Sequence, residues 1–153
     1  MSVKEKLSAL GLTLPTAAAP VAAYVPAVKS GSLVFTAGQL PVVDGKLVKE
    51  DKVGSEVSAE DAKELAQICA LNALAAISLV AELDQIERVV RVGGFVNCAP
   101  GFTAIPGVVN GASEILIKIF GDVNGKHART AVGVAELPLN APVEIEMVVQ
   151  LKN

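Results

Sequence analysis

The sequence predicts an α+β domain in which one β-sheet carries two helices on one of its faces. Two segments place apolar residues at helical spacing, while the segments around them are short, apolar and bounded by turn signals such as Asp-Gly. In chain order they give the pattern β-β-α-β-α-β-β. The 153 residues suit one domain, and 52% of them are apolar, which is enough for a substantial core. We expect a single domain over residues 1–153, with residues 1–19 as an N-terminal extension.

The first elements follow from periodicity and turn signals. Apolar residues at helical spacing predict a short helix over residues 3–10. The segment AAYVPAVKSGSLVFTAGQLPVVDGKLV then predicts strands around turns at Ser30-Gly31 and Asp44-Gly45. The clearest helix begins at Ser58, whose side chain is a suitable N-cap ahead of acidic first-turn residues, and its apolar pattern continues to residue 83.

The second half predicts a long strand, a helix and two closing strands. The strand over residues 86–99 contains Gly93-Gly94, which suggests a bulge or a close approach by another backbone. The segment APGFTAIPG is expected to be a loop, and a helix over residues 108–120 follows it. The last strands are expected over 129–136 and 143–151. Helices on one face leave the other face of the sheet bare, and an oligomer would cover it.

The last two strands carry the most informative charges. Side chains alternate across a strand, so Arg129 shares a face with small residues and Glu144 shares a face with Glu146. We expect the apolar alternate residues of both strands to face the core, with Arg129 on the opposite face. An arginine that binds a carboxylate, beside a glutamate that positions water, suits hydrolysis of a small carboxylate-bearing substrate. The residues alone favour the simpler interpretation, an arginine–glutamate ion pair that stabilises a subunit interface.

Composition argues against several classes of function. The net charge of −3 and the 3% of aromatic residues provide no basic patch or stacking platform, so no nucleic-acid partner is expected. The uncharged segment over residues 66–81 is short for a membrane span, and no membrane partner is expected. Cys69 and Cys98 lack metal-ligand spacing and indicate free thiols in a reducing, cytoplasmic setting. His127, the only histidine, has no partner motif and is interpreted as structural, so no metal site is expected.

Three features occur together in an order that is specific as a set. They are the segment YVPAVKSGSLVFTAGQLPVVDGKLV, Asn110 at the start of the second long helix, and the segment ARTAVGVAELPLNAPVEIE. With them the chain resembles the Rid family of reactive intermediate deaminases, also called YjgF-like or L-PSP-like. The resemblance implies a chorismate-mutase-like fold and a homotrimer with a barrel-like core and clefts between subunits. It also implies that no metal or organic cofactor is used.

The resemblance further implies an activity and a set of site residues. Characterised members of the family hydrolyse reactive enamine and imine intermediates, such as 2-aminoacrylate, to keto acids and ammonia. By position, Arg129 would bind the substrate carboxylate and Glu144 would position the attacking water. The cleft would be lined by the side chains of Tyr24 and Asn110 and by backbone groups of Gly38 and Ala131.

The chain departs from the best-characterised deaminases at two of these positions. It has Ala37 where they often have serine, and Ala131 where they often have cysteine, so activity survives only if backbone groups act there. The loop over residues 97–107 resembles a longer, less characterised branch of the family, and Phe102 and Cys98 are expected at the rim of the cleft. Two other functions stay open: a non-catalytic carboxylate-binding or regulatory trimer, and an endoribonuclease or translation inhibitor, which the acidic pI disfavours.

Overall fold

A five-stranded sheet forms the centre of the computed structural model, which describes residues 1–19 and 22–153. The strand order is β1-β2-β7-β5-β6, and every neighbouring pair is antiparallel except β5 and β6. The strands are β1 Ala27–Ser30, β2 Leu33–Thr36, β5 Ile86–Asn97, β6 Ala128–Val134 and β7 Val143–Leu151. A separate hairpin, β3 Val42–Val43 with β4 Lys46–Leu47, turns at Asp44-Gly45 and adds two short strands to the predicted pattern.

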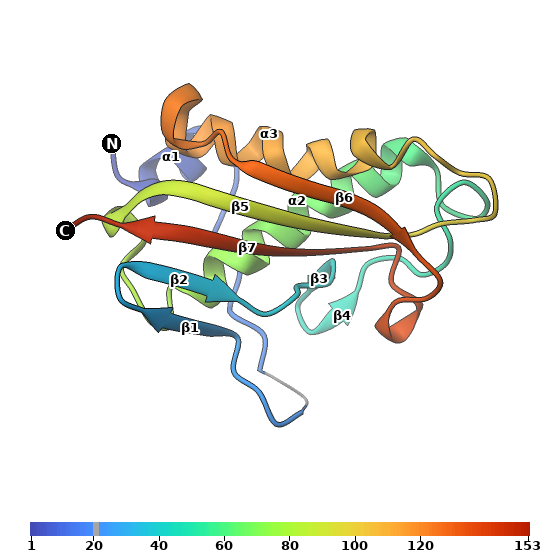
Figure 1. Cartoon of the computed structure of the whole chain (residues 1–153), viewed down its shortest axis with the longest axis horizontal. Helices are drawn as coiled ribbons and strands as arrows, with labels where there is room; N and C mark the ends of the chain where they lie inside the picture. The colour runs from blue at the N-terminus through green and yellow to red at the C-terminus, as the bar shows by residue number, and fades with distance from the viewer. Residues whose placement is uncertain (20–21) are drawn as a thin grey trace.

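The two long helices pack side by side on one face of the sheet, as predicted (Figure 1). They are α2, Ala59–Ile77, and α3, Ile105–Asn124. Helix α3 begins earlier than predicted because Pro106 lies in its first turn, where a missing backbone N–H costs no hydrogen bond. Its regular turns stop at Gly121, which has a φ of 84°. The core between sheet and helices includes fully buried Leu74, Val92, Leu116, Ile119, Ile145 and Val149.

Helix α2 starts as predicted, because the Ser58 hydroxyl accepts a hydrogen bond from the backbone N–H of Asp61 at 3.0 Å. It ends at Ile77, before the predicted limit, and a short 3₁₀ helix, η1 Leu83–Gln85, follows. Gly111 of α3 faces the backbone carbonyl of Lys63 on α2, where a Cβ atom would collide with the carbonyl oxygen. This glycine therefore allows the two helices to approach closely.

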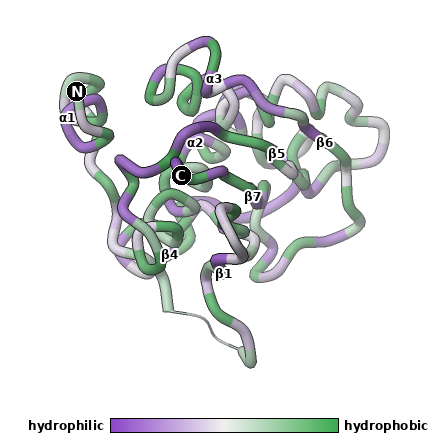
Figure 2. The backbone as a smooth tube through the Cα atoms, turned by 60° about the vertical axis from the view of Figure 1, so that its left-hand side comes forward, coloured by the Kyte–Doolittle hydropathy of each residue, from purple (hydrophilic) through white to green (hydrophobic). Residues whose placement is uncertain are grey.

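The N-terminal helix α1, Val3–Ala9, lies at the edge of the molecule (Figure 2). Its first turn is held by a capping box in which Ser2 and Glu5 exchange hydrogen bonds, and the backbone N–H of Val3 donates to Asp84 Oδ1 at 2.7 Å. The predicted short helix is therefore confirmed. None of the helices in the described ranges combines the length and the hydropathy needed to cross a membrane.

The two glycines in the middle of β5 face opposite sides of the sheet. On the helix side, a Cβ atom at Gly94 would lie 2.5 Å from a methyl carbon of Val109 in α3. On the other side, a Cβ atom at Gly93 would lie 2.8 Å from Cγ of Glu146. The close neighbours are thus side chains and not another backbone, and the irregularities of β5 fall earlier, between Ile86 and Arg91.

The expected orientation of β6 is wrong. Arg129 pairs in register with the fully buried Val92, so its side chain lies on the helix side of the sheet. Ala131 packs against the core, and a Cβ atom at Gly133 would lie 3.0 Å from Sγ of Cys98. Small residues are needed on this face because α3 and the loop before it lie over the edge strand. The valines that were expected to face the core face outward, and Val132 is 39% exposed.

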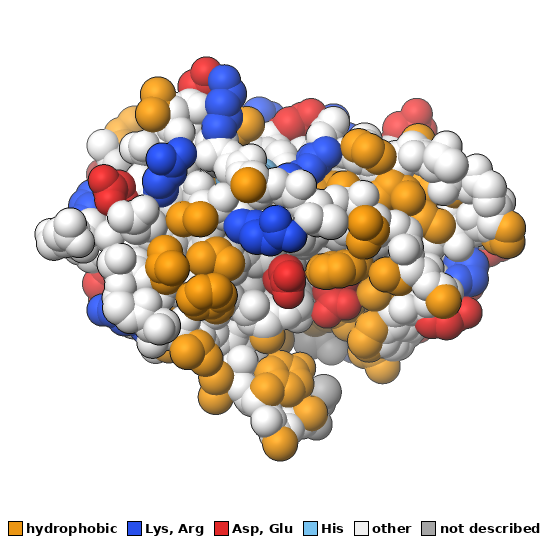
Figure 3. Space-filling view, viewed as in Figure 1, with side chains coloured by type: hydrophobic (Ala, Val, Ile, Leu, Met, Phe, Trp, Pro, Cys, Tyr) orange, Lys and Arg blue, Asp and Glu red, His pale blue; other side chains and the backbone are white. Residues whose placement is uncertain are grey.

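The opposite face of the sheet is open and partly apolar. Its exposed apolar side chains include Val28, Phe35 and Val132. Figure 3, which views this face, shows hydrophobic side chains around a small group of basic and acidic ones. An uncovered face of this kind is suited to contact with another protein surface.

Candidate functional site

The Arg129 guanidinium is held by three neutral acceptors on α3. Nη1 donates to Asn110 Oδ1 at 2.8 Å and to Ser113 Oγ at 3.2 Å, and Nη2 donates to the Pro106 carbonyl at 3.3 Å. Within residues 1–19 and 22–153, no carboxylate lies within ion-pair distance of Arg129. Its positive charge is therefore oriented but not compensated, an arrangement suited to binding an anion.

The spacing of the three acceptors follows from the helix. Pro106, Asn110 and Ser113 lie four and three residues apart, so they share one face of α3. The close contacts at Gly94 and Gly111 fix this helix against the sheet and against α2. The position of Arg129 thus depends on two glycines outside the site.

His127 extends the same hydrogen-bond network. Its Nε2 lies 2.9 Å from Ser113 Oγ, and its Nδ1 lies 2.7 Å from the Gly125 carbonyl oxygen. Burial lowers the pKa of His127, the bond to Gly125 acts in the opposite direction, and the charge of Arg129 lowers the pKa further. The imidazole is therefore neutral near pH 7.

Glu144 lies on the open face of the sheet, next to Gly38. A Cβ atom at Gly38 would lie 2.8 Å from the carboxyl carbon of Glu144. Any side chain at this position would therefore displace the carboxylate. Burial, and then the nearby charge of Glu146, raise the pKa of Glu144. No ion pair engages Glu144 in the described part of the chain. A half-buried carboxylate with a raised pKa is suited to accept a proton from water.

The predicted site residues fall into separate groups within one chain. Arg129 and Asn110 are brought together on the helix side, with Ala131 next along the same strand face. Glu144 and Gly38 are brought together on the open face. The arginine–glutamate ion pair that the residues alone favoured does not form within the described chain.

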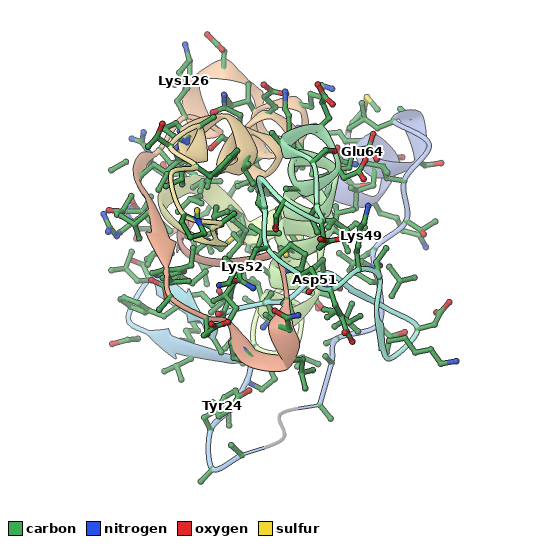
Figure 4. All side chains as sticks on the ribbon, turned by 90° about the vertical axis from the view of Figure 1, so that its right-hand side faces the viewer. Tyr24, Lys49, Asp51, Lys52, Glu64 and Lys126 are labelled. Atoms are coloured by element: carbon green, nitrogen blue, oxygen red, sulfur yellow. The ribbon has the colours of Figure 1, made fainter. Side chains whose placement is uncertain are left out.

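Tyr24 joins neither group. Its side chain is 50% exposed, in the segment before β1 that extends away from the body of the molecule (Figure 4). In the 97–107 loop, Phe102 packs against Gly54, where a Cβ atom would lie 2.8 Å from its ring. Cys98 lies beside Gly133, and burial raises the pKa of its thiol. A rim position for this loop stays a prediction.

Sequence reasoning missed Ser113 and the carbonyl of Pro106 as partners of Arg129. Ser113 was detectable in principle, because it lies one helical turn after Asn110 on the same face. The backbone carbonyl of Pro106 has no signal in the sequence, since every residue carries such a group.

Comparison with known proteins identifies the family. The family model described as "YjgF/chorismate_mutase-like, putative endoribonuclease" matches residues 4–151. The chain belongs to the Rid/YjgF family. This confirms the resemblance stated from the sequence, and the sheet and helices agree with the chorismate-mutase-like fold.

Several known proteins resemble the chain over nearly its whole length. Protein TCP17 of Trypanosoma cruzi is 40% identical over 152 residues, covering 99% of this chain and 95% of the relative. The 2-iminobutanoate/2-iminopropanoate deaminase of Dermatophagoides farinae is 30% identical over 143 residues, covering 92% and 95%. The crystal structure of Atu1372 from Agrobacterium tumefaciens, a protein of unknown function, superposes with a TM-score of 0.89 at 40% identity, covering 99% of this chain and 94% of that chain.

Proposed function

We propose that this protein is a hydrolytic deaminase of reactive enamine and imine intermediates that carry a carboxylate, such as 2-aminoacrylate, with keto acid and ammonia as products. The proposal depends mainly on the environment of Arg129. Its guanidinium donates to neutral acceptors and forms no ion pair with a carboxylate in the described ranges. A guanidinium has five N–H donors, and its three bonds leave two, the number that a bidentate carboxylate requires.

The chemistry assigned to Glu144 is to position and deprotonate water. As the water oxygen forms a bond to the imine carbon and the carbon–nitrogen double bond opens, one water proton passes to the Glu144 carboxylate, which returns it to the imine nitrogen to give the carbinolamine. The hydroxyl proton of the carbinolamine then passes by way of Glu144 to the amino nitrogen, the carbon–nitrogen bond breaks with its electron pair on ammonia, and the remaining carbon–oxygen bond becomes the carbonyl of the keto acid. The raised pKa of Glu144 supports this role, because a more basic carboxylate accepts the proton more readily.

The proposed site is completed between subunits of a homotrimer. The Arg129 group lies on the helix side and the Glu144 group on the open face, so a neighbouring subunit is needed to bring one of each together. The exposed Phe35 and Val132 on the open face support such an assembly, because contact between copies would remove them from water. Tyr24, which extends from the body, would reach the cleft of a neighbour.

A non-catalytic carboxylate-binding or regulatory trimer is the second candidate. It is favoured by Ala37 and Ala131, which lack the side chains often found at these positions in well-characterised deaminases. The two candidates differ only in turnover, since both use Arg129 as the anchor. The endoribonuclease role named in the family description is less favoured here, because the net charge of −3 provides no electrostatic attraction for RNA.

The test supplies 2-aminoacrylate from serine with an excess of a dehydratase, so that imine hydrolysis limits the rate, and follows keto acid and ammonia. The expected result, at imine concentrations below the wild-type KM, is acceleration over buffer that Arg129→Ala removes and the exposed-lysine control Lys118→Ala retains. Saturable binding of 2-oxobutanoate without turnover of any imine would instead establish the carboxylate-binding alternative. RNA cleavage that survives both Arg129→Ala and repeated purification would support the endoribonuclease role.

A further inference from the structure

We propose that Ser113 and His127 are positioning residues that orient Arg129 for its carboxylate. This inference rests on the proposed function, because it concerns the same anchor. Three hydrogen bonds connect the four groups in a row: the Gly125 carbonyl to His127 Nδ1 at 2.7 Å, His127 Nε2 to Ser113 Oγ at 2.9 Å, and Ser113 Oγ to Arg129 Nη1 at 3.2 Å.

The chemistry of the partners fixes the direction of every bond in this row. A carbonyl oxygen only accepts, so the Nδ1 atom of His127 carries the hydrogen. In the neutral ring Nε2 then has no hydrogen and accepts the hydroxyl proton of Ser113. The serine oxygen consequently turns its lone pairs toward Arg129, whose guanidinium can only donate. Without the histidine, the Ser113 hydroxyl would be free to rotate away from this arrangement.

The row is attached to a rigid part of the molecule at both ends. Gly125 is buried, its N–H donates to the Gly121 carbonyl at 2.8 Å, and a Cβ atom on it would lie 2.6 Å from Cα of Ile117. The turn that holds the Gly125 carbonyl is thus packed tightly onto α3. Arg129 is therefore held by Asn110 directly and, through Ser113 and His127, by the C-terminal end of the same helix.

We expect the hydrogen bonds of Ser113 and His127 to affect substrate binding and not the rate of the chemical step. An anchor that holds the carboxylate equally in the bound substrate and in the transition state affects KM and leaves kcat nearly unchanged. Because Asn110 and Pro106 still contact Arg129, loss of the row should raise KM by ~tenfold, near the lower end for a hydrogen bond to a charged group.

One experiment observes the hydrogen bonds of His127 directly, because it is the only histidine in the chain and gives a single imidazole signal. In protein labelled with ¹⁵N-histidine, the single imidazole should be neutral at pH 7 and carry its hydrogen on Nδ1. Its Nε2 resonance should shift in the Ser113→Ala variant and remain unchanged in the Ser8→Ala control, whose serine lies in α1. A ring that carries its hydrogen on Nε2, or an Nε2 resonance that is unchanged in Ser113→Ala, would contradict this arrangement of hydrogen bonds.

A second experiment tests its function in the whole protein. We expect Ser113→Ala and His127→Phe each to raise both KM and the dissociation constant of 2-oxobutanoate, with kcat close to the wild-type value. Ser113→Thr, which keeps the hydroxyl, should restore binding, and His127→Gln provides a second variant if the phenylalanine impairs folding. The double variant should be no worse than Ser113→Ala, because both changes remove the same contact.

The outcomes separate this inference from the function on which it rests. If the wild type hydrolyses imines while Ser113→Ala and His127→Phe bind and turn over like the wild type, the positioning role is overturned and the deaminase stands. If the wild type neither binds 2-oxobutanoate nor hydrolyses an imine, Arg129 is not a carboxylate anchor and both proposals fall together.

Discussion

Arg129 and Glu144 lie on opposite faces of the same sheet. Arg129 pairs with Val92 and donates hydrogen bonds to α3, whereas Glu144 pairs with Phe95 and lies beside Gly38 on the face without helices. No rotamer change brings the two charges together through the sheet within one chain. A site that uses both residues therefore requires more than one copy of the chain.

Replacing Arg129 by lysine should weaken substrate binding strongly and alter stability little. An ammonium group keeps the charge but cannot form two parallel hydrogen bonds to a carboxylate. We expect KM to rise by ~10–100-fold, the equivalent of one or two charged hydrogen bonds. Steady-state kinetics with Lys118→Ala as the control measures this effect. A wild-type KM in Arg129→Lys would remove Arg129 from the site.

Glu144→Gln should lose activity and gain stability at neutral pH. Loss of a group that accepts a proton from water costs ~10²–10⁴-fold in rate. Because burial raises the pKa of Glu144 in the folded state, stability decreases as the pH rises from below the unfolded value of about 4.3 through the raised pKa. The glutamine variant does not ionise, so its Tm should exceed that of the wild type at pH 7 and approach it in acid. A Tm difference between Glu144→Gln and the wild type that stays the same at all pH values would contradict a raised pKa at Glu144.

Gly38→Ala should reduce activity without unfolding the protein. The added Cβ atom would occupy the position of the Glu144 carboxylate, which can rotate away at small cost because it is the end of a flexible side chain. Displacement of a catalytic group by about 1 Å can lower the rate by ~10²-fold. The neighbouring change Ala37→Ser serves as the control and should retain activity. Equal rates in Gly38→Ala and the wild type would show that the position of Glu144 is irrelevant.

Alanine substitution at two glycines of α3 should change the stability of the protein in opposite directions. A Cβ atom at Gly111 would collide with the Lys63 carbonyl, and the two helices must separate to admit it. At Gly107 nothing lies within 4 Å of the added atom, so Gly107→Ala should stabilise by about 0.5–1 kcal/mol through helix propensity. Denaturant unfolding compares the pair, with about 1–3 kcal/mol of destabilisation expected for Gly111→Ala. Stabilisation by both would mean that α2 and α3 are less tightly packed than described.

The sequence was informative wherever a local pattern determines structure. Alternation along β7 correctly predicted that Ile145 and Val149 are buried and that Glu144 lies on the other face. The same reasoning failed for β6, because it assumed that the larger side chains face the core. The edge strand instead turns Arg129, Ala131 and Gly133 toward α3, where little space remains, and valines face outward. Which face of an edge strand is covered depends on tertiary packing, which periodicity does not encode.

Prediction of the site was limited in the same way. The family resemblance pointed to Arg129 and Asn110, which are in contact, and to Glu144 and Gly38, which are also in contact. It did not point to Ser113, and reasoning from the residues treated His127 as an isolated structural histidine. Their part in the network depends on a serine one turn along a helix meeting a ring from the segment after it, a long-range contact without a local signature.

The most direct test of the central claim mixes two inactive variants. Arg129→Ala and Glu144→Gln subunits, unfolded together and refolded as mixed oligomers, are predicted to regain about one quarter of the wild-type rate, because each shared site needs one intact Arg129 and one intact Glu144 from adjacent subunits. The double variant mixed with itself provides the baseline. Recovery to about one quarter would support a deaminase site shared between subunits, whereas mixed oligomers that remain as inactive as the separate variants would contradict it.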